Sequence, residues 1–568
     1  MSVRSWVLAG AATMALMSAN AAVAAPKHRA SGGSSATTRE LMDQVRALRA
    51  QVEALQTRLD GQATQQAATQ SQVEAQQAQV QSAIQAQQAQ VQTSVTQVAQ
   101  QQAEISKRVD KVEHPDKFAF KGITITPGGF LELAGIYRQH QMANDIATGF
   151  NSIPYPNTRT GYTQEARFTA RQSRVSLLAE GDANKRVHLA MYGEFDFQGA
   201  ARTANSNESN SFNPRIRNLY GTVDWRLANG NGLHFLAGQN WSLATMNSKG
   251  ITPRNELTPP QIDAQYVPGF VWTRQPGVRL TADLLDKHLW LAVAVENPQT
   301  TFFTNGTGQG AMVGSNGTAA PLPASLTNNI AGGSGFDPNN NFSLNHVPDV
   351  IGKIAYEASL GGHGVHLEGF GIYRDFYDRV SGSNQDVTGW GVGGGIVAQL
   401  VPGVLDAQFS GLYGKGVGRY GTSQLPDVTF GPDGRISAIR EYMLLAGATL
   451  HATKMLDIYG FAGEEISKGR YFTTAAGQLY GYGNPLYTNY GCYTEGSGVC
   501  NGNTRAIKQI TFGFWQKLYQ GSFGRAQVGA QYSLTRRESF DGLGANGLGF
   551  APRATQNIGF LSFRYYPF

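Results

Sequence analysis

Beyond its first 25 residues, this 568-residue chain contains no apolar run long enough to cross a membrane as a helix. Such a helix needs roughly 20 consecutive apolar residues, and the mean hydropathy is only −0.29. Helical membrane proteins are therefore excluded, whereas proteins that cross a membrane with strands are not. The net charge of +6 is small and dispersed along the chain, so we expect no nucleic acid partner.

The first 24 residues have the pattern of a secretory signal peptide. Arg4 precedes an apolar run from Trp6 to Met17, and the small residues at 22–24 suit cleavage before Ala25. Residues 25–38 are rich in Ser and Gly, as is typical of a flexible leader. We therefore expect an exported protein.

The chain has few residues for metal or covalent chemistry. Its ten histidines show no metal-ligand spacing, and no set of Ser, His and acidic residues is placed for nucleophilic work, so we expect neither an enzyme nor a cofactor. The two cysteines, Cys492 and Cys500, lie close together in a loop rich in Gly, Tyr and Asn. In an exported protein this favours a disulfide, and the alternative, a metal pair, lacks further ligands nearby.

Residues 39–114 are predicted to form an α-helical coiled coil. Apolar residues recur at steps of three and four in two blocks, Leu41, Val45, Leu48, Val52, Leu55 and Leu59, and then Val91, Val95, Val98, Ile105, Val109 and Val112. The register differs between the blocks, which implies a stutter near residues 80–91. A disordered Gln-rich tract over 62–102 is the alternative, but that tract contains no Pro. So narrow a stripe needs partner helices, and Pro115 then ends the helix.

Residues 117–568 are dominated by alternation of apolar and polar residues. In the stretch 186–198, for example, Leu189, Met191 and Phe195 share one face of a strand, and His188 and Glu194 share the other. We predict strands at 128–141, 166–181, 185–198, 213–227, 232–242, 267–282, 286–297, 348–361, 363–377, 388–401, 403–416, 436–452, 455–468, 505–519, 522–537 and 554–568.

Short turns alternate with long loops between these stretches, as in bacterial outer-membrane barrels. The fold class predicted is therefore an all-β transmembrane barrel of about sixteen antiparallel strands, with an aqueous channel. A soluble all-β protein is the alternative, but it would have to bury the charges of the polar face.

The chain ends in an aromatic strand that finishes at Phe568 and resembles the C-terminal signal of outer-membrane barrels. Pro567 departs from that pattern, because it removes a ladder donor. It leaves open whether Leu561, Phe563 and Tyr565 or instead Tyr566 and Phe568 face the lipid.

Several segments resemble the DcaP-like outer-membrane porins. The matching residues are Ser173-Arg174, Glu194 to Phe197, Arg215 to Arg217, Tyr220-Gly221, Leu236 to Ser242 and Arg274 to Arg279. Members of that family are trimers with a periplasmic coiled coil ahead of a sixteen-stranded barrel, and they pass small anions such as dicarboxylates. The resemblance implies a homotrimer in the outer membrane of a Gram-negative cell, surrounded by lipid and lipopolysaccharide, with its coiled coil in the periplasm. It is dense over 170–280 and diffuse beyond.

Strand parity places charged side chains on the lumen side, and we expect these to line the pore. The candidates are Arg174, Arg279, Arg374, Arg525, Arg564, Glu194 and Asp196. Guanidinium groups in a pore attract carboxylates. For each arginine the alternative is a rim contact with lipid headgroups or a structural pair with a lumen carboxylate. Arg215 and Arg217 do not fit the parity of their strand, so they lie above the apolar band or follow a bulge.

The third outer loop, Leu243–Tyr266, carries two further candidates, Lys249 and Arg254. This loop commonly folds into the pore of sixteen-stranded porins, and an exposed surface loop is the alternative. The sequence thus predicts a passive diffusion channel for small hydrophilic anions of the dicarboxylate type. The alternative function is a barrel-anchored adhesive or structural protein whose coiled coil tethers the envelope, for instance to the cell wall.

Overall fold

A computed structural model describes residues 78–82, 84–100, 102, 118–142, 144–199, 213–303, 325–330 and 342–568. The chain divides into two compact units, Met1–Val112 and Glu113–Phe568. In the first unit, residues 78–82, 84–100 and 102 are helical, and Val91, Val95 and Val98 are exposed on the single chain. The helical state agrees with the prediction there. The signal peptide, the leader and the rest of the predicted coiled coil lie outside the described residues, and the partner helices stay a prediction.

No helix among the described residues is long and apolar enough to cross a membrane.

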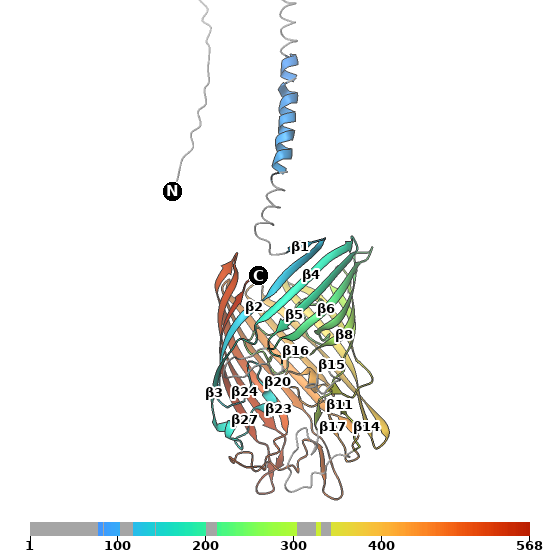
Figure 1. Ribbon diagram of the computed structural model, residues 1–568, viewed down its shortest axis with the longest axis vertical. Coiled ribbons are helices and arrows are strands. Elements are labelled where there is room, and N and C mark those ends of the chain that lie inside the picture. The colour runs from blue at the N-terminus through green and yellow to red at the C-terminus, as the bar shows by residue number, and fades with distance from the viewer. Residues whose placement is uncertain are drawn as a thin grey trace, which may run out of the picture. The chain divides into compact units, whose positions relative to one another are not determined.

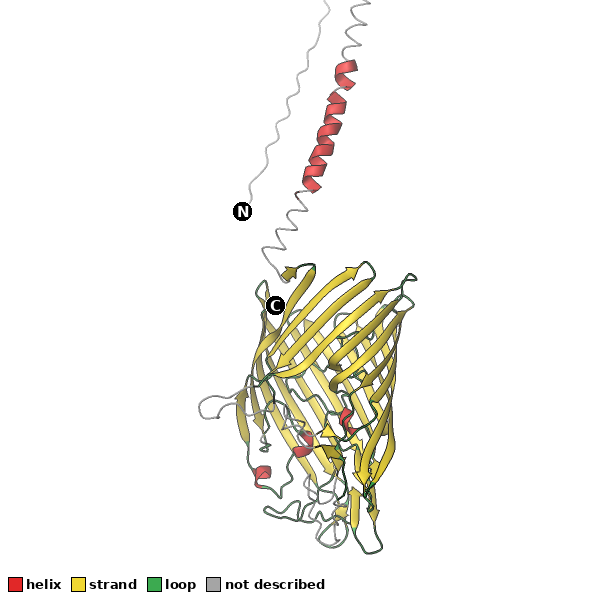
Figure 2. Ribbon diagram, turned by 45° about the vertical axis from the view of Figure 1, so that its right-hand side comes forward, coloured by secondary structure: helices red, strands yellow, loops and turns green. Residues whose placement is uncertain are grey.

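The second unit is a closed antiparallel β-barrel, drawn in Figures 1 and 2. Within the described residues its wall has sixteen strands, counting β3 and β4 as one interrupted strand. They are β2 (Ile123–Arg138), β3 (Glu165–Thr169) with β4 (Arg174–Asn184), β5 (Val187–Asp196), β6 (Arg215–Arg226), β7 (Gly232–Trp241), β8 (Arg274–Leu284), β9 (Leu289–Glu296), β13 (Asp349–Leu360), β14 (His363–Val380), β15 (Ser383–Val401), β16 (Leu405–Lys415), β19 (Arg440–Thr453), β20 (Leu456–Ser467), β23 (Thr504–Gly521), β24 (Gly524–Ser539) and β27 (Arg553–Tyr566). Each pairs with the next, and β27 pairs with β2 to close the barrel.

Side-chain exposure alternates along the strands as the sequence pattern predicts. In β2, Leu131 and Leu133 are 65% and 53% exposed, whereas Glu132 and Ala134 are 4% and 0% exposed. One face of each strand therefore suits lipid and the other lines the lumen. In β27, Leu561 belongs to the outward set, which settles the question that Pro567 left open.

Short turns and long connections lie at opposite ends of the barrel, with one exception. The predicted long loop between residues 377 and 388 is wrong, because β14 and β15 continue to Val380 and Ser383 and meet in a tight hairpin. Ser381 and Gly382 have φ of +48° and +85°. Two successive left-handed residues give the turn that matches the twist of a hairpin.

Short strands order the long connections. β10 (Phe302–Phe303) pairs with β17 (Val428–Phe430), which pairs with β18 (Ile436–Ala438). The connection after β9 is therefore fastened to the connection after β16. β1 (Phe118–Phe120) adds to β2 at the other end of the barrel.

Two long connections fold into the barrel, the 242–273 loop between β7 and β8 and the 416–439 loop between β16 and β19. The prediction that a strand begins at residue 267 is wrong, because β8 begins only at Arg274. Val267 and Phe270 instead pack in an apolar cluster with Trp515 and Phe560 of the far wall, and they are 0% and 1% exposed. The apolar residues of this segment alternate as in a strand, but they pack inside the lumen.

Glycines on the lumen face of β15 make room for both loops. A Cβ on Gly395 would lie 2.7 Å from Sδ of Met246 in the 242–273 loop, and one on Gly391 would lie 3.0 Å from Val417 of the 416–439 loop. Side chains at these positions would collide with the loops. The glycine cluster of β15 therefore allows the two loops to pack closely against this strand.

Candidate functional site

Carboxylates on the wall from β9 to β20 hold the inward loops. Glu296 accepts a hydrogen bond from the backbone N–H of Leu243 at 2.7 Å. Glu368 accepts one from the N–H of Asn247 at 3.1 Å. Backbone donors inside a barrel must find acceptors, and these carboxylates supply them.

Glu465 of β20 joins the two loops. Its Oε1 accepts a hydrogen bond from the N–H of Gly269 at 2.8 Å, and its Oε2 accepts one from the N–H of Ser423 at 3.0 Å. Since Glu465 is 0% exposed, its carboxyl group faces loop backbone and not open water.

Lys353 and Glu368 form a buried ion pair next to the 242–273 loop. Their atoms Nζ and Oε1 are 2.7 Å apart, and both side chains are 0% exposed. Lys353 also donates to the carbonyl of Thr245 at 2.7 Å. This pair therefore holds the loop in place, and its charges are not accessible to a solute.

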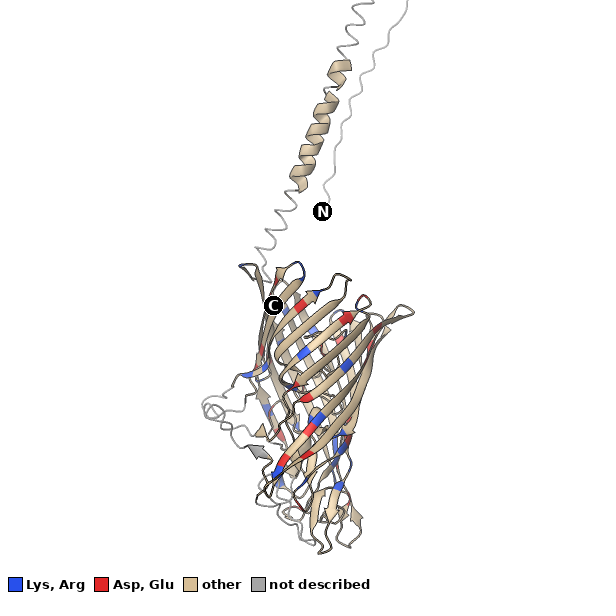
Figure 3. Ribbon diagram, turned by 90° about the vertical axis from the view of Figure 1, so that its right-hand side faces the viewer, with Lys and Arg blue, Asp and Glu red and all other residues tan. Residues whose placement is uncertain are grey.

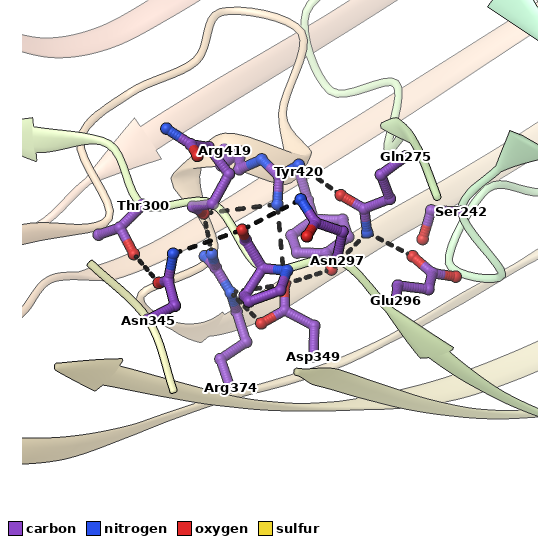
Figure 4. A network of polar contacts seen from close by, with 12 residues as sticks. Ser242, Gln275, Glu296, Asn297, Thr300, Asn345, Asp349, Arg374, Arg419 and Tyr420 are labelled. Carbon is purple, nitrogen blue, oxygen red and sulfur yellow. Dashed lines mark hydrogen bonds and ion pairs between the residues drawn. The ribbon is translucent and has the colours of Figure 1, made fainter. Parts of the chain in front are cut away.

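Arg374 lies in a second buried network, drawn in Figure 4. It is 1% exposed and forms ion pairs of 3.2 Å with Asp349 and 2.8 Å with Asp427. It also donates to the carbonyl of Gly416 at 2.7 Å, and the hydroxyl of Tyr420 donates to Asp349 at 2.8 Å. Parity placed Arg374 correctly on the lumen side, but the expectation that it lines the pore does not fit, because the 416–439 loop covers it.

The wall from β4 to β8 is rich in arginine, and Figure 3 shows the charges along the barrel strands. We call the following set the arginine wall: Arg174, Arg215, Arg217, Arg274 and Arg279. Three carboxylates interact with it, those of Glu194, Asp196 and Glu256. These five guanidinium groups therefore share three carboxylates, while Asp224 and Asp283 of the same strands lie against His234.

Three residues of the arginine wall, Arg215, Arg217 and Arg279, are tied to carboxylates or backbone. Asp196 accepts from Arg215 at 2.9 and 2.6 Å and from Arg217 at 3.0 Å. Arg217 also donates to Glu194. Arg279 is 6% exposed and donates to the carbonyl of Trp241 at 2.6 Å, at the base of the 242–273 loop.

A β-bulge explains why Arg217 faces the lumen. Glu194 of β5 lies opposite Asn218 of β6, but the next residue, Phe195, lies opposite Ile216. Arg217 is thus the extra residue, and beyond a bulge the side-chain alternation changes face. Of the two explanations left open by the sequence, the structure shows the bulge.

Arg174 and Arg274 form no ion pair with any residue that the structure describes. The guanidinium of Arg174 lies 5.3 Å from the ring of Phe130, and that of Arg274 lies 5.1 Å from Trp241 and 5.2 Å from Trp272. Nε of Arg174 and Nη1 of Arg274 are buried and find no hydrogen-bond partner among the described residues. Aromatic rings attract a cation by about 0.5–2 kcal/mol, yet they leave strong N–H donors unused.

The pKa of Tyr266 in the 242–273 loop depends on the electrostatic potential near the arginine wall. Burial raises the pKa of its phenol, but the positive charges of Arg217, Arg174 and Arg274 outweigh burial and bring that pKa below its ordinary value. A site that favours a phenolate also favours other anions.

The remaining candidates lie apart from this set. Arg564 pairs with Glu132 at 3.0 Å and lies 4.5 Å from the ring of Trp515. Arg525 lies 4.1 Å from the ring of Tyr566, next to the end of the chain. Lys249 and Arg254 are exposed on the 242–273 loop, and Arg254 lies 5.5 Å from the ring of Tyr192.

Sequence reasoning missed a set of histidines that lie between two carboxylates. The ring nitrogens of His234 lie 2.7 Å from Asp224 and 2.8 Å from Asp283. His366 lies 2.7 Å from Glu357 and 3.1 Å from Glu368, and His451 lies 2.7 Å from Asp457 and 3.3 Å from Asp406. We call these three the histidine bridges.

Carboxylates only accept hydrogen bonds, so a ring that donates from both nitrogens is a charged imidazolium. Linear spacing could not reveal these bridges, but strand pairing could. His234 lies directly opposite Asp224, His366 opposite Glu357, and His451 opposite Asp457. A cavity of about 550 Å³ beside the 242–273 loop is lined by His366 and His451, together with Lys249, Glu357 and Asp406.

One group among the described residues brings metal-type ligands together. Atoms of His346, Asp375 and Asp386 lie within 4.8 Å of one another. However, Nε2 of His346 is 3.2 Å from Asp375 and 3.1 Å from Asp386. A protonated histidine satisfies both carboxylates, so the geometry does not require a metal.

The chain was compared with known proteins. No protein-family model and no curated protein matches it. Among solved structures, the outer membrane channel DcaP of Acinetobacter baumannii has a TM-score of 0.54 at 18% identity, covering 79% of this chain and 99% of that chain. An anion-selective porin from Comamonas acidovorans has a TM-score of 0.39 at 11% identity, covering 78% and 99%. OprB of Pseudomonas putida has a TM-score of 0.40 at 9% identity, covering 78% and 94%.

The chain therefore has the fold of a porin-like outer-membrane channel. The resemblance to the DcaP-like porins, predicted from short segments, is confirmed at the level of the fold.

Proposed function

We propose that the protein is an outer-membrane channel through which small hydrophilic anions, dicarboxylates among them, diffuse passively. The observation that carries this proposal is the pair Arg174 and Arg274. Each is a half-buried guanidinium on the lumen side of the wall that forms no ion pair with a described residue.

The chemistry of guanidinium fits this role. Its fork of N–H donors matches a carboxylate, and two such groups on one wall suit a solute with two carboxylates. At contact distance in water, one charge pair contributes about 1 kcal/mol, and more where water is partly excluded. Attraction of this size draws anions in without holding them, as permeation requires.

The same proposal includes the assembly and orientation of the protein. We place the long connections outside the cell and the short turns in the periplasm, as in bacterial outer-membrane barrels. Since β2 begins and β27 ends at the short-turn end, the segment that precedes the barrel would then lie in the periplasm. The apolar stripe over 39–114 supports self-association of that segment, and we propose a homotrimer.

Planar-bilayer recordings of the purified full-length protein test the proposal. In a gradient of potassium chloride, we expect a reversal potential of anion-selective sign. In liposome swelling, a small dicarboxylate should enter faster than a neutral sugar of similar size, because only the former is attracted by Arg174 and Arg274. A cation-selective reversal potential, or equal entry of both solutes, would contradict the proposal.

A further inference from the structure

Three residues of metal-ligand type meet on the outer face of the barrel, toward its long-connection end. His346 lies in the connection that precedes β13, Asp375 lies on β14 and Asp386 lies on β15. One ligand atom of each residue lies within 4.8 Å of those of the other two. We call these residues the His346 triad. Because they are far apart in the sequence, only the folded barrel brings them together.

Strand pairing positions the two aspartates. Tyr377 of β14 lies directly opposite Asp386 of β15, and Asp375 is two residues from Tyr377 on the same face of its strand. Diagonal neighbours of this kind are about 7–8 Å apart, and His346 enters the gap between them from the connection. Its ring packs on that of Tyr377, with 4.0 Å between the centroids. The imidazole is thus held over both carboxylates.

The triad differs from the histidine bridges in the number of ring nitrogens that it uses. In each bridge, the two nitrogens of the ring face two separate carboxylates. In the triad, Nε2 of His346 alone lies 3.2 Å from Asp375 and 3.1 Å from Asp386. A protonated ring attracts both carboxylates, but its one N–H is shared between two oxygens. A divalent cation would bind all three atoms and balance both negative charges.

Asp375 supplies a second observation that indicates a ligand. Its side chain is 9% exposed, and its Oδ1 is buried without a hydrogen bond from any described residue. This is the oxygen that faces Nε2 of His346. A buried acceptor without a donor is unfavourable, and coordination of a metal ion would remove that cost.

The distances fit a transition-metal ion. Zinc binds imidazole nitrogen and carboxylate oxygen at about 2.0–2.2 Å in tetrahedral geometry, which separates its ligand atoms by about 3.4 Å. The two distances from Nε2 of His346, 3.2 and 3.1 Å, are close to that separation. Asp386 is 56% exposed, so the fourth position is open to water. Calcium fits less well, because it takes about six to eight oxygen ligands.

The triad lies in water and not in the bilayer. Tyr373 of β14 and Trp390 of β15 lie directly opposite each other and are 44% and 41% exposed on the outer face. Exposed aromatic residues of this kind flank the apolar band of a barrel. Asp375 and Asp386 lie beyond this pair, toward the hairpin at residues 381–382. A hydrated metal ion can therefore reach them.

We infer that the His346 triad binds a divalent transition-metal ion, and that zinc is the ion its ligands fit best. A bound ion joins the connection that carries His346 to the hairpin of β14 and β15, and so holds that connection against the barrel wall. The site faces outward and shares no residue with the arginine wall. The inference therefore does not depend on the solute that passes through the lumen.

The experiment titrates zinc chloride into the untagged full-length protein in detergent micelles and measures binding by calorimetry. The test variants are His346→Gln and Asp386→Asn, both at exposed positions. The matched control is His188→Gln. His188 also lies near two carboxylates, 2.9 Å from Asp182 and 3.6 Å from Glu180, but through different ring nitrogens.

We expect the wild type and the control to bind one zinc ion per chain at the triad with equal affinity. Each test variant should bind it at least about tenfold more weakly, since removing even a residue that only orients a metal ligand costs about 10–100-fold in affinity. Calcium at the same concentration should not displace zinc. In the wild type, zinc should also slow amide hydrogen exchange at residues 344–347, and in His346→Gln it should not. Unfolding curves with a chelator present should coincide for all variants, which shows that they are folded.

Equal zinc affinity in the wild type and in His346→Gln would overturn the inference. An equal loss in His188→Gln would do so too, because zinc would then bind histidines of the barrel without regard to the triad. Full displacement of zinc by calcium would reduce the site to its carboxylates and contradict the role of the imidazole. Zinc binding without slower exchange at 344–347 would contradict the joining of the connection to the hairpin.

Discussion

The wall from β4 to β8 and the wall from β9 to β20 both carry many charged side chains toward the lumen, but the two use charge differently. On the second wall, carboxylates such as Glu368 and Glu465 accept hydrogen bonds from backbone N–H groups of the inward loops. On the first wall, Arg174 and Arg274 are half-buried and form no ion pair with a described residue. The comparison shows that a position on the lumen face is not enough for a charged side chain to interact with a solute. What decides is whether that side chain is already paired with another group of the protein.

The physical reason lies in the loops. A loop that crosses a lumen carries backbone donors away from bulk water, and a buried donor without a partner costs about 1–3 kcal/mol. Wall carboxylates remove that cost. The same hydrogen bonds keep these carboxylates away from passing ions, which leaves the arginine wall to set the selectivity.

The largest expected effect comes from the buried cation of the second wall. Arg374→Met leaves Asp349 and Asp427 without their guanidinium, and breaking a buried pair costs about 3–5 kcal/mol. Chemical unfolding in micelles should show a loss of stability of that order. The matched control is Arg435→Met, because Arg435 pairs with Asp433 in the same loop while both are more than half exposed. Its effect should stay within about 1 kcal/mol, and equal losses in the two variants would break the comparison.

The histidine bridges allow the two walls to be compared by the pH dependence of ion selectivity. When an imidazolium loses its proton, the local charge falls by one, so the anion preference should decrease as the pH rises through its titration and be retained below it. The side chain of His234 is 27% exposed on the first wall, whereas that of His366 is 3% exposed within the fastening of the 242–273 loop. His234→Gln should therefore remove more of the pH dependence of the reversal potential than His366→Gln. A larger effect of His366→Gln than of His234→Gln would show that the buried charges next to the 242–273 loop also act on permeating ions.

The smallest effect is expected outside both walls. The structure joins Cys492 and Cys500 in a disulfide within the connection between β20 and β23. Replacing both with Ser should leave the conductance and the reversal potential unchanged, because no charge of either wall moves. Bilayer recordings with and without a reductant on the wild type provide the check, and a shift in selectivity would mean that this connection shapes the lumen.

Alternation along the strands was enough to predict the barrel, since one face meets lipid and the other meets water. It failed where apolar residues pack inside the lumen, as Val267 and Phe270 do, because the period of a strand and the pattern of such a loop look alike. It also failed at the hairpin of Ser381 and Gly382, whose polar residues resemble a long loop.

Parity predicted the lumen side of Arg174 and Arg374 but could not separate their environments. The difference depends on the 416–439 loop, whose path is set by contacts between residues far apart in the sequence. Arg217 became a lumen residue through a bulge, which shows only once the pairing of β5 and β6 is known. Arg274 lies in a segment that resembles the DcaP-like porins, yet strand alternation does not select it, because it has the same parity as Val278 and Leu280, which face outward.

The central claim is that one wall offers its charges to solutes while the other uses them to hold loops. Reversal potentials in a potassium chloride gradient test it most directly, on the wild type, on Arg174→Gln with Arg274→Gln, and on Glu465→Gln. The account predicts a clear shift toward cations for the arginine variant, with a several-fold loss of anion preference, and no measurable shift for Glu465→Gln. Shifts of similar size and opposite sign would contradict it, because they would mean that all lumen charges face the solute alike.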